Sequence, residues 1–391
     1  MFAMHRSRSL PALIACLTVV LACGPMASPP PAAPAAKPAA SAPGTSGTAP
    51  AASAPAASNP AQERIVAGAR NEGALTLVWS DSSLGGQEGA QKIVDAINRK
   101  HNLQLKLTFT PGPSMPEVAV RMMQELAAGR PATSDVFLGR EANVKALMQN
   151  GVLQAADWPV LSPYIKPEMT APDNAAVEIA TVVVGVTYNT NLVPRDRVPR
   201  TTAEVLRPEW RGKFATPPYP QFLDVLGSPE MWGAERTIAF TRELVNHAGG
   251  LMRCGETERI ISGEFSMLVF DCGSGPARTW ALKGAPVAAT VLNDAAALLY
   301  YYMGVPKNSA HPNAATLFIL ETLTPEAQEL IWDMWGHDHP KVTGARSAQE
   351  IREAEARGAK FIEANVQLMM SYPEQEYVRK QTDEILRQTS R

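Results

Sequence analysis

The feature that most constrains the fold is a repeated order of a short apolar segment, a polar loop and an amphipathic helix. In the first helical segment, Ile93, Val94 and Ile97 recur on one face, as expected of a helix packed on a core. Strand, loop and helix in this order are typical of a parallel sheet in an α/β domain. We expect strands over 74–79, 103–109 and 135–138, with helices over 87–100, 116–129 and 139–150.

Polar residues follow each of these expected strands. Ligands of open α/β sheets bind beyond the carboxyl ends of the strands, so these loops are expected to face a common site. Arg140 can clamp a carboxylate or phosphonate with two N–H donors, or it can pair with Glu141 or lie on the surface. The candidate ligand contacts from the three loops are Ser80, Asp81, Ser82, Ser114 and Arg140.

The N-terminal segment indicates export. Arg6 and Arg8 precede an apolar run over 10–21, a pattern typical of a secretory signal peptide. Cys23 follows the small residue at its end, and the site resembles a bacterial lipobox, which implies lipidation of Cys23. We expect a signal peptide over 1–22 and a disordered Pro/Ala/Ser tether over 23–62, on a membrane-anchored periplasmic or cell-surface protein. The alternative is an ordinary signal peptide with an unmodified cysteine.

Composition excludes several function classes. The chain has 36 basic and 38 acidic residues, a balance that does not favour nucleic acid or an anionic membrane surface as a partner. We find no CxxC, HExxH, P-loop or GxGxxG motif, and predict no catalytic residue, cofactor or metal site. Cys254 and Cys272 form either a disulfide or two buried thiols. The segment 337–339 (His-Asp-His) is interpreted as a solvated loop rather than a metal site.

Further along, a series of short motifs resembles one family. These motifs, which together span Gly73 to Gln328, are Tyr188-Asn189-Thr190, Thr201-Thr202 with Glu204, Pro208-Glu209-Trp210-Arg211-Gly212-Lys213, Gly263-Glu264, 305–315 and Thr324-Pro325-Glu326. In their order and spacing they resemble the extracellular solute-binding proteins of ABC importers, in the type 2 periplasmic-binding-protein class and its ferric-iron-binding-like group.

The resemblance implies two α/β lobes, each a mainly parallel sheet flanked by helices, with a ligand cleft between them. We expect lobe 1 to comprise 63–174 and 298–340, and lobe 2 to comprise 175–297 and 341–391. The implied function is a monomeric, lipid-anchored receptor that closes about a hinge and delivers a small ligand to an ABC permease and ATPase, without catalysis. The alternative is an extracytoplasmic sensor or enzyme on the same scaffold.

The resemblance also bears on the ligand. Two adjacent tyrosines ligate iron in ferric-binding relatives, and those positions hold Cys272 and Gly273 here. We expect the run 300–302 (Tyr-Tyr-Tyr) to pack in the core or hinge. Asp271 either contacts the ligand or serves a turn. Tyr219 and Gln221 lie in a proline-rich segment where relatives hold an anion at a helix start, and we expect them to contact the ligand. An organic anion, a phosphonate or a chelated metal is therefore expected.

Overall fold

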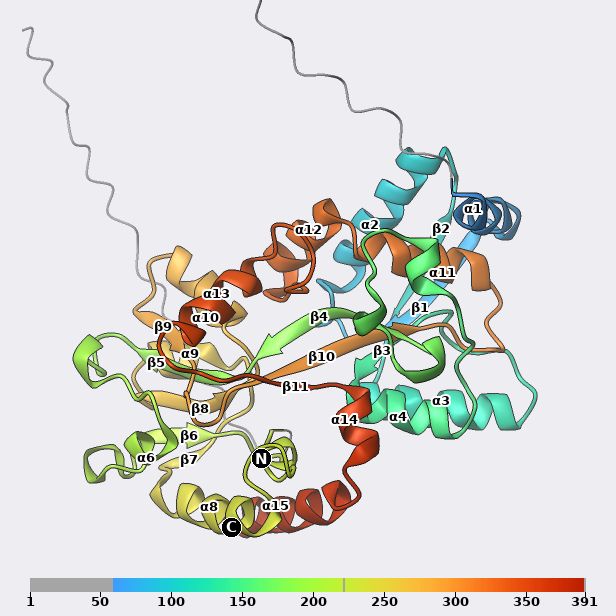
Figure 1. Cartoon of the computed structure of the whole chain (residues 1–391). Helices are drawn as coiled ribbons and strands as arrows, with labels where there is room; N and C mark the ends of the chain where they lie inside the picture. Colours follow the sequence, from blue (N-terminus) through green and yellow to red (C-terminus); the bar gives the residue numbers. More distant parts are fainter. Residues whose placement is uncertain (1–58, 221, 390–391) are drawn as a thin grey trace, which may run out of the picture. The chain divides into compact units, whose positions relative to one another are not determined.

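The computed structural model describes residues 59–220 and 222–389 (Figure 1). The predicted lipidation site Cys23, the signal peptide, the tether and Gln221 lie outside these residues. The strands are β1 (Ala74–Trp79), β2 (Lys106–Pro111), β3 (Phe137–Arg140), β4 (Val177–Val183), β5 (Gly185–Asn189), β6 (Phe214–Thr216), β7 (Gly250–Leu251), β8 (Met267–Asp271), β9 (Val287–Thr290), β10 (Ala297–Gly304) and β11 (Ile362–Ala364).

Helices separate most of these strands. They are α1 (Pro60–Glu72), α2 (Gly86–His101), α3 (Met115–Ala127), α4 (Glu141–Gln149), α5 (Trp158–Leu161), α6 (Thr202–Val205), α7 (Leu223–Leu226), α8 (Ala234–His247), α9 (Thr257–Ile261), α10 (Gly275–Leu282), α11 (Pro312–Thr322), α12 (Pro325–Trp335), α13 (Arg346–Glu355), α14 (Val366–Ser371) and α15 (Gln375–Thr389). The α/β fold class is confirmed. Among the described residues, no helix combines the length and apolar character needed to span a bilayer.

The strands form sheets of mixed rather than mainly parallel pairing. β1 and β2 pair in parallel, and a second sheet has the order β11-β10-β3 with β4 also on β10. A third sheet has the order β7-β6-β8-β5-β9, in which β6 pairs in parallel with β7 and β8, and β5 pairs antiparallel with β8 and β9. The expectation of mainly parallel sheets is thus met by the β1–β2 sheet and by only part of the other two.

Two expected strands differ for identifiable reasons. Asn98 bonds the backbone N–H and C=O of Leu105 at 2.8 and 3.0 Å, so β2 begins at Lys106, after this residue. Asp135 takes the place expected for the third strand beside β1, because its N–H donates to Thr76 O at 2.8 Å and its Oδ2 accepts from Thr76 N at 2.7 Å. The chain then turns away, and β3 pairs antiparallel with β10.

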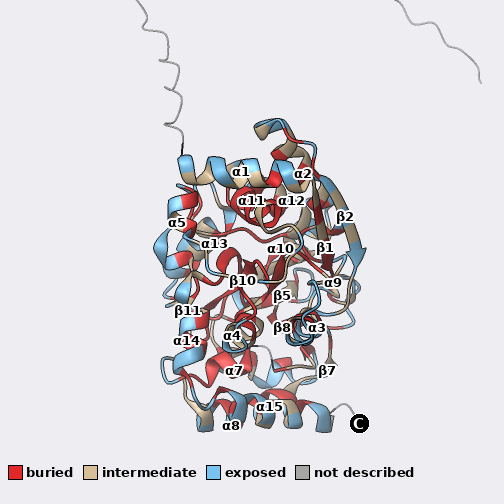
Figure 2. Cartoon of the chain, turned by 90° about the vertical axis from the view of Figure 1, so that its right-hand side faces the viewer, coloured by how far each residue is buried: buried red, intermediate tan, exposed pale blue. Residues whose placement is uncertain are grey.

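One hydrophobic core packs on the Tyr300 and Tyr302 face of β10. Two further cores lie toward opposite ends of the β4–β10 pair. One contains Leu75, Ile93 and Phe318 with β1, α2 and α11, and the other contains Val186 and Phe214 with the five-stranded sheet. Helix α11 is buried beneath α1, whose outer face is exposed (Figure 2). The chain passes from the sheet of β4 to that of β5 at residue 184 and returns between β9 and β10.

Candidate ligand-binding site

A cavity of about 310 Å³ brings together elements that are distant in the sequence. It lies among the first turns of α3 and α4, the loop before α7, strand β10 and helix α15. Its lining residues are Met115, Pro116, Arg140, Glu141, Ala142, Asn143, Tyr219, Pro220, Asp224, Tyr301 and Arg379. A larger cavity of about 360 Å³, between 167–174 and 363–367, contains none of the predicted site residues.

Arg140 is the most constrained cation of this cavity. It is the last residue of β3, and its N–H donates to the side chain of Asn143 at 3.2 Å, which fixes the start of α4. Glu141 accepts from Arg140 Nε at 3.0 Å and from Nη2 at 3.3 Å, whereas the buried Nη1 has no hydrogen-bond partner. Burial opposes the charge, but Glu141 and Tyr301 outweigh it and raise the pKa of Arg140. The guanidinium is therefore charged and has one donor nitrogen unused.

Tyr301 forms the wall beneath Arg140. The guanidinium carbon of Arg140 lies 5.1 Å from the centre of the Tyr301 ring, and Trp335 packs against the same ring at 4.4 Å between centroids. Strand alternation sends Tyr300 and Tyr302 to the opposite face, where both are buried. Tyr300 and Tyr302 thus pack in the core, one of the two roles expected for the run, whereas Tyr301 packs partly against the cores and also lines the cavity.

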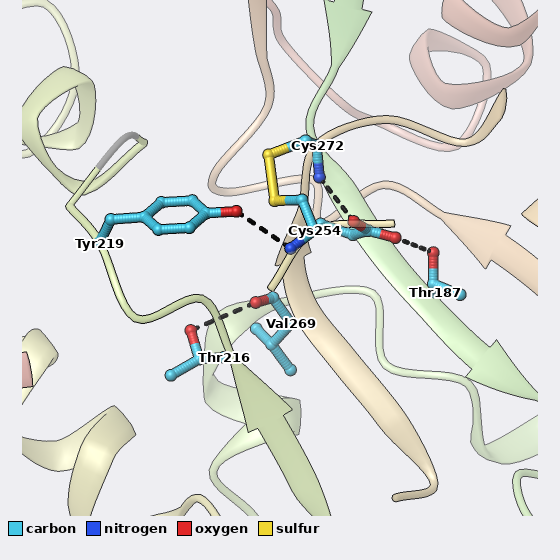
Figure 3. Close-up of a disulfide and its surroundings, with 7 residues drawn as sticks. Thr187, Thr216, Tyr219, Cys254, Val269 and Cys272 are labelled. Atoms are coloured by element: carbon cyan, nitrogen blue, oxygen red, sulfur yellow. Dashed lines mark hydrogen bonds between the residues drawn. A yellow bond between two sulfur atoms is a disulfide. The ribbon is translucent and has the colours of Figure 1, made fainter. Parts of the chain in front are cut away.

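Tyr219 also lines the cavity, and a disulfide-bonded loop holds its hydroxyl (Figure 3). Cys254 and Cys272 are disulfide-bonded, and the backbone N–H of Cys254 donates to the hydroxyl of Tyr219 at 3.0 Å. Burial raises the pKa of Tyr219, so the phenol is neutral. A neutral phenol with a bonded acceptor retains its own O–H as a donor for a ligand.

Asp271 lies behind Tyr219, at the end of β8. Its carboxylate accepts from Thr187 Oγ1 at 2.6 Å and from the N–H of Cys272 at 2.8 Å. Together with Tyr219 and Phe270 it borders a space of only about 10 Å³. Asp271 does not line the 310 Å³ cavity. Burial raises the pKa of Asp271 to about 6. In the described structure, the two donors from Thr187 and Cys272 occupy this carboxylate.

Asp224 is an acid that the sequence did not identify. It lies on the short helix α7, is 6% exposed and lines the cavity with Arg140. Its Oδ1 has no hydrogen-bond partner, and its Oδ2 has Gln375 Nε2 at 3.5 Å. Burial, reinforced by Glu141, raises the pKa of Asp224 to about 7. The cavity thus contains a buried carboxyl group with unused acceptor capacity.

The other predicted contacts lie outside this cavity's lining. Ser114 caps α3, next to Met115, and its hydroxyl donates to Glu117 at 2.6 Å. Ser80 and Ser82 bond to each other at 2.9 Å, and Asp81 is exposed. β1 and β3 belong to different sheets, so the loops that follow them are not gathered at one sheet edge as expected.

The interpretation of residues 337–339 as a solvated loop is wrong. His337, Asp338 and His339 are all buried. His339 Nε2 lies 3.2 Å from Glu178, and Asp338 accepts from the backbone of Ser347 at 3.0 Å. The segment is a packed corner beneath β10, and the flanking glycine and proline that suggested exposure instead shape the corner. Within the described residues, no group of three or more His, Cys, Asp or Glu side chains is arranged to hold a metal.

The structure therefore adds Asp224, Glu141, Tyr301 and Arg379 to the predicted Arg140 and Tyr219. A four-residue helix such as α7 has no periodicity that sequence analysis can detect, which explains the omission of Asp224. Arg379 is contributed by α15, which packs on α7 and α8 from far along the chain. For Tyr301, the available sequence signal was the alternation of side chains between the two faces of β10.

Comparisons with solved structures identify this architecture. The chain superimposes on the substrate-binding protein of an ABC transporter from Agrobacterium tumefaciens with a TM-score of 0.63, at 17% identity, over 82% of this chain and 97% of that one. Iron-bound HitA from Pseudomonas aeruginosa gives 0.61 at 18% identity, over 80% and 99%. The spermidine/putrescine protein PotD from Streptococcus pneumoniae gives 0.55 at 14%, over 79% and 99%. These matches confirm the two-lobed fold.

The sequence comparison gives the family. No curated protein matches the chain significantly. The family model described as bacterial extracellular solute-binding protein matches residues 92–359, which is more than half of the chain. The chain therefore belongs to the bacterial extracellular solute-binding proteins, a family of binding proteins rather than enzymes.

Proposed function

We propose that this protein is an extracytoplasmic receptor that delivers a small organic anion to an ABC importer. The observation that carries the proposal is the unpartnered, buried Nη1 of Arg140 at the cavity wall. A buried donor without a partner costs free energy, and a carboxylate, a phosphonate or the anionic chelator of a metal would satisfy it. Tyr219 and Tyr301 would flank such a ligand.

Tyrosinate-ligated ferric iron is not the ligand that we favour. HitA is named as iron-bound, but the resemblance to the ferric-binding group places that group's iron-ligating tyrosines at Cys272 and Gly273 of this chain. The sulfur of Cys272 is bonded to Cys254, and Gly273 has no side chain. Iron would have to arrive within an anionic chelate to use Arg140.

Thermal unfolding of the full-length protein tests the proposal. We expect one class among carboxylates, phosphonates and ferric chelates to raise the unfolding temperature. A ligand at a hundredfold excess over its Kd adds about 2.7 kcal/mol to the free energy of unfolding. Arg140→Gln should abolish the rise, whereas the control Arg278→Gln should retain it, because Arg278 pairs with Glu350 outside the cavity lining.

Two results would contradict the assignment: no stabilisation by any anion, or equal stabilisation of the wild-type protein and Arg140→Gln. Circular dichroism of Arg140→Gln without ligand establishes that the variant is folded. Neighbouring genes for a permease and an ATPase would support import, whereas a neighbouring sensor kinase would support the alternative role of a sensor.

We further propose that the receptor works as a monomer anchored through lipidated Cys23, with 23–62 as its tether. Cys23→Ser should move the protein from the membrane to the soluble fraction, and retention in the membrane would contradict the anchor.

For the two lobes, we propose that one comprises 63–174 with 298–340 and the other 175–297 with 341–391. The cores at opposite ends of the β4–β10 pair support this division, and so does the packing of α15 on α7 and α8. Helix α14 of the last segment, however, packs on α4 of lobe 1.

A further inference from the structure

We infer that the ligand is a zwitterion, whose cationic amine binds Asp224 while its anionic group binds Arg140. This inference rests on the proposed anion site and names a second, opposite charge on the same ligand. It is carried by two buried, unpartnered atoms of opposite charge on residues of one cavity, Arg140 Nη1 and Asp224 Oδ1.

Asp224 is not a structural ion-pair partner. Its carboxylate has the long contact of Oδ2 with Gln375 and a backbone hydrogen bond from Val225, and no salt bridge joins it to the cations of the described residues. A buried carboxylate without partners is costly, and such groups are retained where a ligand or partner charge completes them. An ammonium group, with three donors and a positive charge, would complete Asp224.

The charges around Asp224 support an amine rather than a second anion. Glu141 faces it from α4, and its acceptors are directed at Arg140. Arg140 and Arg379 approach from β3 and α15 and lower the pKa of Asp224, and Tyr372 faces it from the end of α14 with an unpartnered hydroxyl. Burial still raises the pKa of Asp224 to about 7, so the attraction of Arg140 and Arg379 offsets the effect of burial only in part.

The unpartnered carboxyl of Asp224 also allows a second binding mode, whose pH dependence is different. A protonated Asp224 could donate its O–H to an ordinary anion, and binding would then weaken as pH rises through about 7. An ammonium ligand needs the ionised carboxylate, so its binding should tighten over the same interval. The sign of the pH effect therefore separates the two arrangements in the unmodified protein.

Calorimetry on the full-length protein at pH 6 and pH 8 tests the inference. The probes are matched sets: 4-aminobutyrate with butyrate and butylamine, and aminoethylphosphonate with ethylphosphonate and ethylamine. At pH 8 we expect one zwitterion to bind about tenfold or more tighter than its deaminated anion, because a hydrogen bond between charged groups is worth roughly that factor. Its affinity should be lower at pH 6.

The Asp224→Asn variant should lose the zwitterion's advantage and keep the affinity for the plain anion. The control Asp173→Asn, in the other cavity, should behave like the wild-type protein. Equal or tighter binding of the plain anion, with affinity falling from pH 6 to pH 8, would overturn the zwitterion and leave the anion receptor intact. Absence of binding by every probe, or full binding by Arg140→Gln, would overturn the anion receptor itself.

Discussion

Asp271 shows how one side chain can support a site without lining it. Its carboxylate is 2% exposed and joins β5 to the end of β8 through Thr187 and the N–H of Cys272. Cys272 is bonded to Cys254, whose N–H holds Tyr219. The position of the Tyr219 hydroxyl at the cavity therefore depends on a short chain of contacts that ends at a buried acid.

Burial of Asp271 predicts a specific pH dependence of stability. Its pKa is about 6 in the folded protein against 3.8 for an unperturbed aspartate. Because the folded-state pKa is raised, its favourable contribution is present below pH 4 and is lost as pH rises to 6. At pH 7, Asp271→Asn should therefore be more stable than the wild-type protein, by on the order of 3 kcal/mol.

The two proteins should be equally stable below pH 4, because both carry a neutral group there. Urea unfolding at pH 4, 5, 6 and 7 measures the difference. A constant difference for Asp271→Asn would refute the burial argument.

At the scale of elements, the disulfide connects the loop before α9 to the end of β8. The two cysteines are 18 residues apart, and Cys254 itself carries the N–H that bonds Tyr219. In the chain-entropy account, a disulfide stabilises the fold by restricting the unfolded chain. Here it also restricts the loop whose backbone bonds Tyr219, a residue of the cavity lining.

The paired variant Cys254→Ser with Cys272→Ser should therefore lower the free energy of unfolding by about 3 kcal/mol. It should also weaken ligand binding, because the support of Tyr219 loosens. Denaturant unfolding and calorimetry measure the two effects, and Tyr219→Phe serves as a comparison that leaves the disulfide intact. Unchanged affinity in the serine variant would show that the loop holds Tyr219 without the bond.

How far the elements follow from the sequence depends on where their contacts lie. Strand β1 and helix α2 were predicted closely, because alternation and one apolar face are local signals. The pairing of β3 with β10 was not predicted. It depends on the Asp135 side chain, which accepts a hydrogen bond from β1 in place of a third strand. Arg140 and Tyr219 were identified from strand ends and resemblance, whereas Asp224 and Arg379 come together only through tertiary packing.

At the scale of the molecule, we propose that the lobes close about β4 and β10. These antiparallel strands lie between the two cores, and the chain passes between the sheets at their ends. The cavity takes residues from both sides of this pair. Rotation about such connecting strands would bring Arg140 and Asp224 together around a ligand.

A closing motion predicts a measurable change in dimensions. Small-angle scattering of the full-length protein should show a smaller radius of gyration in the presence of a saturating ligand that calorimetry has identified. Arg140→Gln, measured under the same conditions, should retain the dimensions of the free protein. Identical curves for the free and the saturated wild-type protein would contradict closure.

Tyr301 gives this arrangement a further consequence. Its ring packs against both cores, lies beneath the guanidinium of Arg140 and belongs to the strand about which the lobes would turn. A ligand that contacts this ring would act directly at the proposed hinge, so binding and lobe rotation would be coupled through one side chain. Adaptation to a new ligand would then change the angle of closure together with the shape of the binding site.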